Sequence, residues 1–105
     1  MTFDYGVIDI AVQRILSVMD PVKVILFGSA ARGEASEDSD MDLLIVSETD
    51  DTVEEAIRAR LAIGVVGVPV DILVYTPGEF SELSGNRHSV VYNAIEEGRV
   101  LHDGS

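Results

Sequence analysis

The sequence predicts an α/β domain built on one small β-sheet. Short apolar runs at 24–27, 43–46 and 70–75 are typical of strands that are covered on both faces. Segments with helical periodicity alternate with these runs, and such alternation is typical of α/β domains. A chain of 105 residues has the usual size of one domain, so we expect residues 1–105 to form a single domain.

A first helix is predicted over residues 7–19. Its apolar residues recur at the spacing of one helical face: Ile8, Val12, Ile15 and Met19. Pro21 cannot continue the helix, so the chain turns before the strand at 24–27. That strand ends at Gly28, and the strand at 43–46 follows an acidic loop.

A second helix is predicted over residues 53–62. Thr52 and Glu55 have the spacing of a capping box at its start. The apolar face of this helix is expected to contain Val53, Ala56, Ile57 and Leu61. Two glycines, Gly64 and Gly67, are expected to end it.

The last third of the chain is predicted to contain two further helices. Thr76, Pro77 and Glu79 mark the start of the first of them, with proline at the first helical position. Apolar residues at 90, 91, 94 and 95 predict a final helix that ends at Gly98. A short strand at 100–101 is expected to follow.

The composition is strongly acidic. Nineteen acidic and seven basic residues give a formal net charge of −12. This charge repels phosphodiester backbones and anionic lipids, so we expect neither a nucleic acid nor a membrane partner. Adaptation to a salty cytoplasm is an alternative origin of the acidity, since Lys23 is the only lysine, and it would weaken that argument.

The chain contains no cysteine, which excludes disulfides, thiolate metal sites and cysteine nucleophiles. Any metal must therefore bind oxygen or imidazole. The N-terminal segment lacks the basic start of a signal peptide, and no apolar run reaches the roughly 18 residues of a membrane span. We therefore expect a cytoplasmic protein.

The loop between the first two predicted strands has the residues best suited to chemistry. Gly28 and Ser29 end a strand and are expected to lead into a short helix, whose free N–H groups would form an anion cradle. Arg32 is placed either to reach the same anion or to pair with a nearby carboxylate. Its candidate partners are Glu34, Glu37 and Asp38.

Asp40 and Asp42 form a candidate pair of metal ligands. They are two residues apart at the start of a strand, so their carboxylates face the same side of the sheet. Two such carboxylates repel each other unless a cation lies between them, and Mg²⁺ prefers oxygen ligands. The alternative is a solvated loop, where aspartate is common.

Asp71 is a third candidate ligand. It lies within the run at 70–75, and a buried strand rarely tolerates an unpaired charge. If this strand lies beside the strand of Asp42, three carboxylates can surround two metal ions, as in two-metal phosphoryl chemistry. The alternative is an aspartate at a strand edge that faces water or bonds to the backbone.

This pattern resembles the minimal nucleotidyltransferases of the polymerase β superfamily. Gly28-Ser29 is followed by ten residues and then by Asp40-Met41-Asp42, and Asp71 follows on a later strand. The local sequences ARG and SDMDL are also similar to that family. The resemblance covers about residues 24–75, with a family-like segment at 90–101.

The resemblance implies a small mixed sheet flanked by helices, the nucleotidyltransferase fold, and binding of ATP with two Mg²⁺ ions. It implies that Gly28 and Ser29 hold the outer phosphates. It further implies that Asp40 and Asp42 ligate the metals, while Asp71 ligates one metal and helps to deprotonate the acceptor hydroxyl.

Many stand-alone members of this size are antitoxins paired with a HEPN-type ribonuclease toxin, and some adenylylate a tyrosine of that toxin. The implied function is therefore a protein adenylyltransferase that silences such a partner in a hetero-complex. Two alternatives remain: a non-catalytic antitoxin that neutralises the toxin by binding, and a nucleotidyltransferase that acts on a small molecule.

Three residues qualify this interpretation. Ala30 departs from the family, which often has arginine or an aromatic residue there, so nucleotide contacts on that side are in doubt. His88 and His102 have no partner at metal-ligand spacing, and we assign them no catalytic role.

Overall fold

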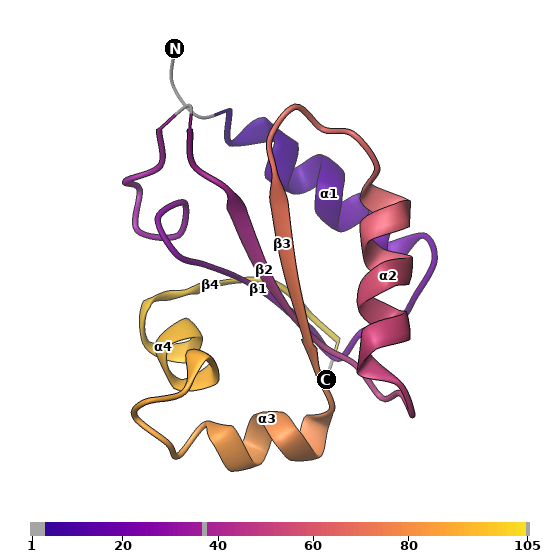
Figure 1. Cartoon of the computed structure of the whole chain (residues 1–105), viewed down its shortest axis with the longest axis vertical. Helices are drawn as coiled ribbons and strands as arrows, with labels where there is room; N and C mark the ends of the chain where they lie inside the picture. Colours follow the sequence, from indigo (N-terminus) through magenta and orange to yellow (C-terminus); the bar gives the residue numbers. More distant parts are fainter. Residues whose placement is uncertain (1–3, 37, 105) are drawn as a thin grey trace.

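The computed structural model describes residues 4–36 and 38–104. The strands are Lys23–Phe27 (β1), Met41–Val46 (β2), Val70–Tyr75 (β3) and Arg99–Asp103 (β4). The helices are Gly6–Leu16 (α1), Thr52–Ile63 (α2), Pro77–Leu83 (α3) and Val90–Glu97 (α4). The strands form one sheet in the order β3-β2-β1-β4 (Figure 1). The predicted α/β class, a small sheet flanked by helices, is confirmed.

The sheet is mixed. β1 pairs antiparallel with both β2 and β4, whereas β2 pairs parallel with β3. The register places Asp42 of β2 between Phe27 of β1 and Asp71 of β3. Directly opposite residues point to the same side of a sheet, so these three side chains share one face.

Helices cover both faces of the sheet. α1 and α2 enclose a buried cluster that includes Leu26, Leu43 and Ile45, whereas α3 and α4 cover a smaller cluster around Leu44 and Val46. In Figure 1, α3 and α4 lie toward the lower end of their face, away from the upper end where β2 and β3 begin. Asp42 alternates with Met41 and Leu43 along β2, so it belongs to the face of α3 and α4.

Several element boundaries differ from the prediction by a few residues. α1 ends at Leu16 instead of residue 19, because the chain turns at Ser17 before Pro21. β2 begins at Met41, two residues early, since its pairing with β1 extends to Phe27. β4 is a full edge strand of five residues that pairs with β1, longer than the predicted strand at 100–101.

The start of α2 differs from the predicted capping box. Asp51 is the N-cap, and its side chain accepts a hydrogen bond from the Glu54 N–H at 3.0 Å. Glu55 points into the protein, where it accepts hydrogen bonds from the Ser47 hydroxyl at 3.0 Å and from Arg58 at 2.8 Å. The predicted box of Thr52 and Glu55 is therefore wrong, because Glu55 ties the helix to the end of β2.

The orientation of α2 also contradicts the predicted apolar face. Its buried residues are Glu55, Ala59 and Ile63, and only Ala56 of the predicted face packs against the core. Val53, Ile57 and Leu61 are exposed. Small alanines let the helix approach closely, and hydrogen bonds from the Ser47 hydroxyl to Glu55 and from Arg60 to the Val70 carbonyl fix its rotation.

β3 is an edge strand. It was predicted to be covered on both faces, but only one of its faces is covered. Only Ile72 is fully buried in it, whereas Asp71 and Leu73 are exposed on the other side. The continuous apolar run concealed this difference, because β-branched residues are also common on half-exposed strands.

Capping residues begin both C-terminal helices. Thr76 and Glu79 form the reciprocal capping box at the start of α3, with Pro77 at the first helical position, as the sequence predicts. The Ser89 hydroxyl accepts a hydrogen bond from the Tyr92 N–H at the start of α4. Within the described residues, no helix is both long and apolar enough to cross a bilayer.

Candidate active site

The turn after β1 begins at Gly28, which has a φ of +75°. Residues 29–33 form a turn held by hydrogen bonds from the Arg32 N–H to the Gly28 carbonyl and from the Glu34 N–H to the Ser29 carbonyl. Residues 29–33 therefore form a single hydrogen-bonded turn. The short helix expected after Gly28-Ser29 is not formed in this described segment. In this part of the chain Ser29 is partly exposed and no hydrogen bond from its N–H is seen, as an anion cradle requires, whereas Ala30 is buried.

Gly28 and Asp42 are packed against each other. A Cβ atom at Gly28 would overlap the Oδ2 atom of Asp42 and would lie 3.2 Å from its Cγ. Only glycine therefore allows the main chain to pass this close to the carboxylate. The contact places the candidate phosphate cradle directly beside a candidate metal ligand.

Asp42 and Asp71 form a carboxyl pair across β2 and β3. They are directly opposite in the parallel register. Burial raises the pKa of Asp42 above its ordinary value, and the negative charges of Asp71 and Asp40 and a hydrogen bond with Asp71 raise it further. The charge of Arg32 has the opposite, smaller effect on this pKa. Asp71 and Asp40 thus both act on Asp42 at this end of the sheet.

Asp71 lies beside Asp42, as the predicted metal site requires. It is not buried, although the prediction was based on its burial. Its strand does lie beside that of Asp42, yet Asp71 itself is exposed. The proximity of a second carboxylate, and not burial of Asp71, is what makes this aspartate unusual.

The donor set suits a divalent cation. Within residues 4–36 and 38–104, no three carboxylate or imidazole side chains are already gathered around a single point. Asp71 and Asp40 raise the pKa of Asp42 through the repulsion of like charges, and a bound cation would relieve that repulsion. Carboxylate oxygens beside a turn that can bind phosphate match the preference of Mg²⁺ for oxygen ligands shared with phosphates.

Arg32 pairs with two carboxylates. It donates to Glu34 at 2.7 Å, as one of the sequence alternatives expects, and to Glu97 at the end of α4 at 3.4 Å. Its hydrogen bond with Glu34 raises the pKa of Arg32. Glu37 lies outside the described residues. Because these pairs are exposed and exposed ion pairs are weak, a phosphate can compete for the guanidinium.

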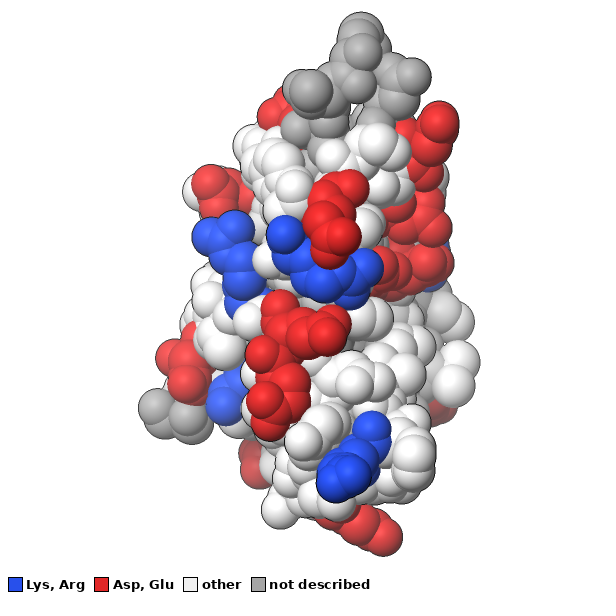
Figure 2. Space-filling view, turned by 90° about the vertical axis from the view of Figure 1, so that its left-hand side faces the viewer, with Lys and Arg blue, Asp and Glu red and all other residues white. Residues whose placement is uncertain are grey.

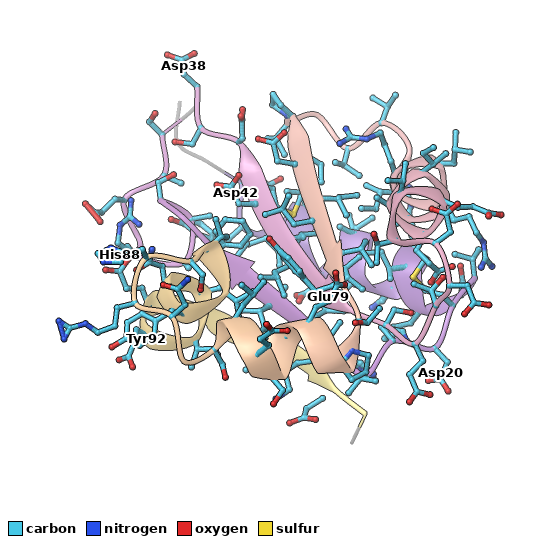
Figure 3. All side chains as sticks on the ribbon, turned by 60° about the horizontal axis from the view of Figure 1, so that its bottom comes forward. Asp20, Asp38, Asp42, Glu79, His88 and Tyr92 are labelled. Atoms are coloured by element: carbon cyan, nitrogen blue, oxygen red, sulfur yellow. The ribbon has the colours of Figure 1, made fainter. Side chains whose placement is uncertain are left out.

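Basic and acidic side chains alternate on one side of the molecule (Figure 2). Figure 2 shows basic side chains in a short band on the left-hand side of the Figure 1 view, with acidic side chains above and below it. In Figure 3, Asp42 lies on the sheet below the loop of Asp38, whereas Glu79 lies at the opposite end. The candidate site therefore lies at the end of the sheet away from α3 (Figure 3).

Two hollows lie outside this site. One of about 410 Å³ is lined by Glu48, Thr49, Asp50, Thr76 and Pro77 at the far ends of β2 and β3. Another of about 230 Å³ lies between α1 and β4. The first is larger but has two acidic side chains and no basic one, so it is poorly suited to a triphosphate.

Two residues, Ala30 and Glu97, change the predicted surroundings of the nucleotide and of Arg32. Ala30, which departs from the family pattern, is 1% exposed as a whole residue and packs in the core, so neither its side chain nor its N–H is accessible to a nucleotide. Glu97 was not anticipated as a partner of Arg32, because 65 residues separate them and only the fold brings them together.

The chain is similar to known proteins in sequence and in fold. Residues 8–102 match the family model of the nucleotidyltransferase domain. A Methanocaldococcus jannaschii protein named "Putative protein adenylyltransferase" is 37% identical over 81 residues, which are 76% of this chain and 77% of that protein. A crystal structure described as a "putative nucleotidyltransferase" from Sulfolobus solfataricus has a TM-score of 0.62 at 18% identity, covering 94% of this chain and 79% of its own.

The chain therefore belongs to the nucleotidyltransferase domain family. It is a transferase, and nucleotidyl transfer implies a nucleotide substrate. The structural likeness supports the same fold, as the resemblance implies.

Proposed function

We propose that the chain is a Mg²⁺-dependent protein adenylyltransferase that transfers AMP from ATP to a hydroxyl group of a partner protein. The observation that carries this proposal is the Asp42–Asp71 carboxyl pair beside Gly28. A protein acceptor is supported by the relative named for protein adenylyl transfer. The net charge of −12 disfavours a nucleic acid acceptor.

In this proposal each residue near the turn has a distinct role. The main-chain N–H group of Ser29 and the Arg32 guanidinium bind the outer phosphates, and Gly28 allows their close approach. Asp40, Asp42 and Asp71 hold Mg²⁺, with two ions expected. When bound, Mg²⁺ neutralises charge on the reacting phosphates.

The transfer step is an in-line displacement at phosphorus. The acceptor hydroxyl oxygen forms a bond to the α-phosphorus of ATP, while the bond from that phosphorus to the oxygen bridging to the β-phosphate breaks. Pyrophosphate leaves with the electron pair of that bond. Asp71 accepts the hydroxyl proton, a role that suits its exposed position at the sheet edge.

The partner we propose is a HEPN-type ribonuclease toxin, modified on a tyrosine, so that the chain acts as its antitoxin. The family resemblance of the Gly28-Ser29 and Asp40-Met41-Asp42 segments supports this assignment. The acidic surface also fits a basic protein partner, because opposite charges speed association.

Label transfer tests the proposed function. The chain is incubated with its co-purified proteins, Mg²⁺ and ATP labelled on either the α- or the γ-phosphate. We expect label from the α-phosphate alone, lost in Asp42→Asn and retained in Asp50→Asn, which removes a carboxylate from the exposed loop after β2. Label from the γ-phosphate would indicate a kinase. Neutralisation of the toxin by Asp42→Asn without any label would indicate a binding antitoxin.

A further inference from the structure

α2 has a row of large apolar side chains on its outer face. Val53, Ile57 and Leu61 are 68%, 53% and 76% exposed, and Val65, just beyond the helix, is 95% exposed. Residues spaced four apart lie on one side of a helix, so the row is continuous along its length. We call these four residues the α2 stripe.

The α2 stripe is not needed for the fold of a single chain. The opposite side of the helix contacts the core through Glu55, Ala59 and Ile63. Ile57 therefore points directly away from the protein. Single exposed apolar residues are ordinary, but a contiguous row of them is typical of an interaction surface.

The charge of α2 indicates what can cover the stripe. Within Thr52–Ile63, two acidic residues, Glu54 and Glu55, balance two basic residues, Arg58 and Arg60. The helix is thus neutral in a chain with a net charge of −12. Two copies of such a chain repel each other over most of their surfaces, and a neutral apolar face is where that repulsion is weakest.

The flank of the stripe is self-complementary. Glu54 and Arg58 are four residues apart on the same side of the α2 stripe, and both are exposed. Within its own chain the Arg58 guanidinium also donates to Glu55 and to the Val18 carbonyl, both at 2.8 Å. If a second copy of α2 runs antiparallel about a two-fold axis at Ile57, Glu54 of one copy lies next to Arg58 of the other. The same symmetry brings Val53 of each copy against Leu61 of the other.

We propose that two copies of this chain associate through their α2 stripes, antiparallel about a two-fold axis at Ile57. Each contact then occurs twice, as in an isologous dimer. α2 packs on the face of the sheet opposite to Asp42 and Asp71, so both candidate active sites stay open in this dimer. The dimer is therefore independent of the proposed transfer reaction.

Cysteine cross-linking tests the geometry, because the natural chain has no cysteine. Ile57→Cys places one thiol on the two-fold axis, and Val100→Cys places an equally exposed thiol on β4 as the matched control. Under mild oxidation we expect Ile57→Cys to form a covalent dimer at least about 10-fold faster than Val100→Cys. Equal rates for the two variants would overturn the proposed geometry.

Sedimentation equilibrium of the full chain tests the association itself. We expect a mass of twice 11.3 kDa at high protein concentration, and a tighter dimer at about 0.5 M salt than at about 0.05 M, because salt screens the repulsion of two acidic chains. Leu61→Glu should weaken the dimer by roughly 30-fold or more, whereas Val100→Glu adds the same charge elsewhere and should not.

A chain that stays monomeric at every concentration and salt level overturns the proposal. So does a dimer that Leu61→Glu and Val100→Glu affect equally. Nucleotide transfer by Leu61→Glu is expected to equal that of the natural chain, so a failure of the dimer can be distinguished from a failure of the proposed enzymatic function.

Discussion

Asp42 and Asp71 occupy directly opposite positions of the parallel strands β2 and β3. Burial of Asp42, the negative charge of Asp71 and a hydrogen bond between them raise the pKa of Asp42. The fold therefore holds together two groups that repel each other when both are ionised. Such an arrangement is unfavourable for stability alone and becomes favourable when a cation binds.

Removing the Asp42 carboxylate should lower the transfer activity without lowering the stability of the fold. We expect Asp42→Asn to lower the rate of nucleotide transfer at least about 100-fold, because a metal ligand is lost. Without metal, its free energy of unfolding should be equal to that of the natural chain or up to about 1 kcal/mol higher, because a like-charge repulsion is relieved. Transfer assays and thermal unfolding measure the two effects. Retained transfer would remove Asp42 from the site.

The same carboxylate should make stability depend on pH. An acid whose pKa is raised by folding binds more protons in the folded state, so its contribution to stability is present below pH 3.8, its ordinary pKa, and is lost as pH rises through the raised pKa. The unfolding free energy of the natural chain minus that of Asp42→Asn should therefore decrease as pH rises over this range. Mg²⁺ should reverse that fall by favouring the ionised form. A difference independent of pH would contradict the raised pKa.

Gly28 should be needed for its contact with Asp42 and not merely for its backbone conformation. Gly28→Ala and Gly33→Ala both place a side chain at positive φ, at +75° and +73°, and each should cost about 1 kcal/mol of stability. Only the Cβ at Gly28 meets Asp42, whereas nothing lies within 4 Å of a Cβ at Gly33. We expect transfer to be lost in Gly28→Ala and kept in Gly33→Ala. Equal activities of the two variants would argue against a site at this contact.

Gly98 should be important for stability. A Cβ there would overlap the Ala94 carbonyl oxygen and lie 2.8 Å from both the Ile25 Cγ2 and the Leu26 carbonyl oxygen. Gly98→Ala should therefore lower the unfolding free energy by about 2 kcal/mol or more. Gly85→Ala, whose Cβ would come no closer than 3.9 Å to its nearest neighbour, is the control and should change it by less than about 0.5 kcal/mol. Chemical denaturation of both variants measures the difference.

The sequence was informative where local chemistry determines structure. The helix start at Thr76, Pro77 and Glu79 and the strands at 24–27 and 70–75 depend on neighbouring residues, and the structure confirms them. The adjacency of β2 and β3 was stated as a condition for the metal site, and the pairing of Asp42 with Asp71 fulfils it. The metal-binding role itself remains a prediction.

The sequence was misleading where contacts between distant segments determine how a helix is oriented or which residues pair. Large apolar residues predicted the inner face of α2, but the buried hydrogen bond from Ser47 to Glu55 and the close packing of Ala59 turn Ile57 outward. Nothing in the local pattern reveals that a buried glutamate will find a hydroxyl partner eight residues away. The pairing of Arg32 with Glu97 likewise depends on where α4 ends relative to the turn after β1.

The most direct test of the candidate site is calorimetric titration of the chain with a non-hydrolysable ATP analogue, with and without Mg²⁺, in the natural chain, Asp42→Asn and Asp50→Asn. We predict that binding requires Mg²⁺, weakens at least about 10-fold in Asp42→Asn and stays unchanged in Asp50→Asn. Binding of equal strength without Mg²⁺, or in Asp42→Asn, would contradict a metal-nucleotide site at the Asp42–Asp71 pair.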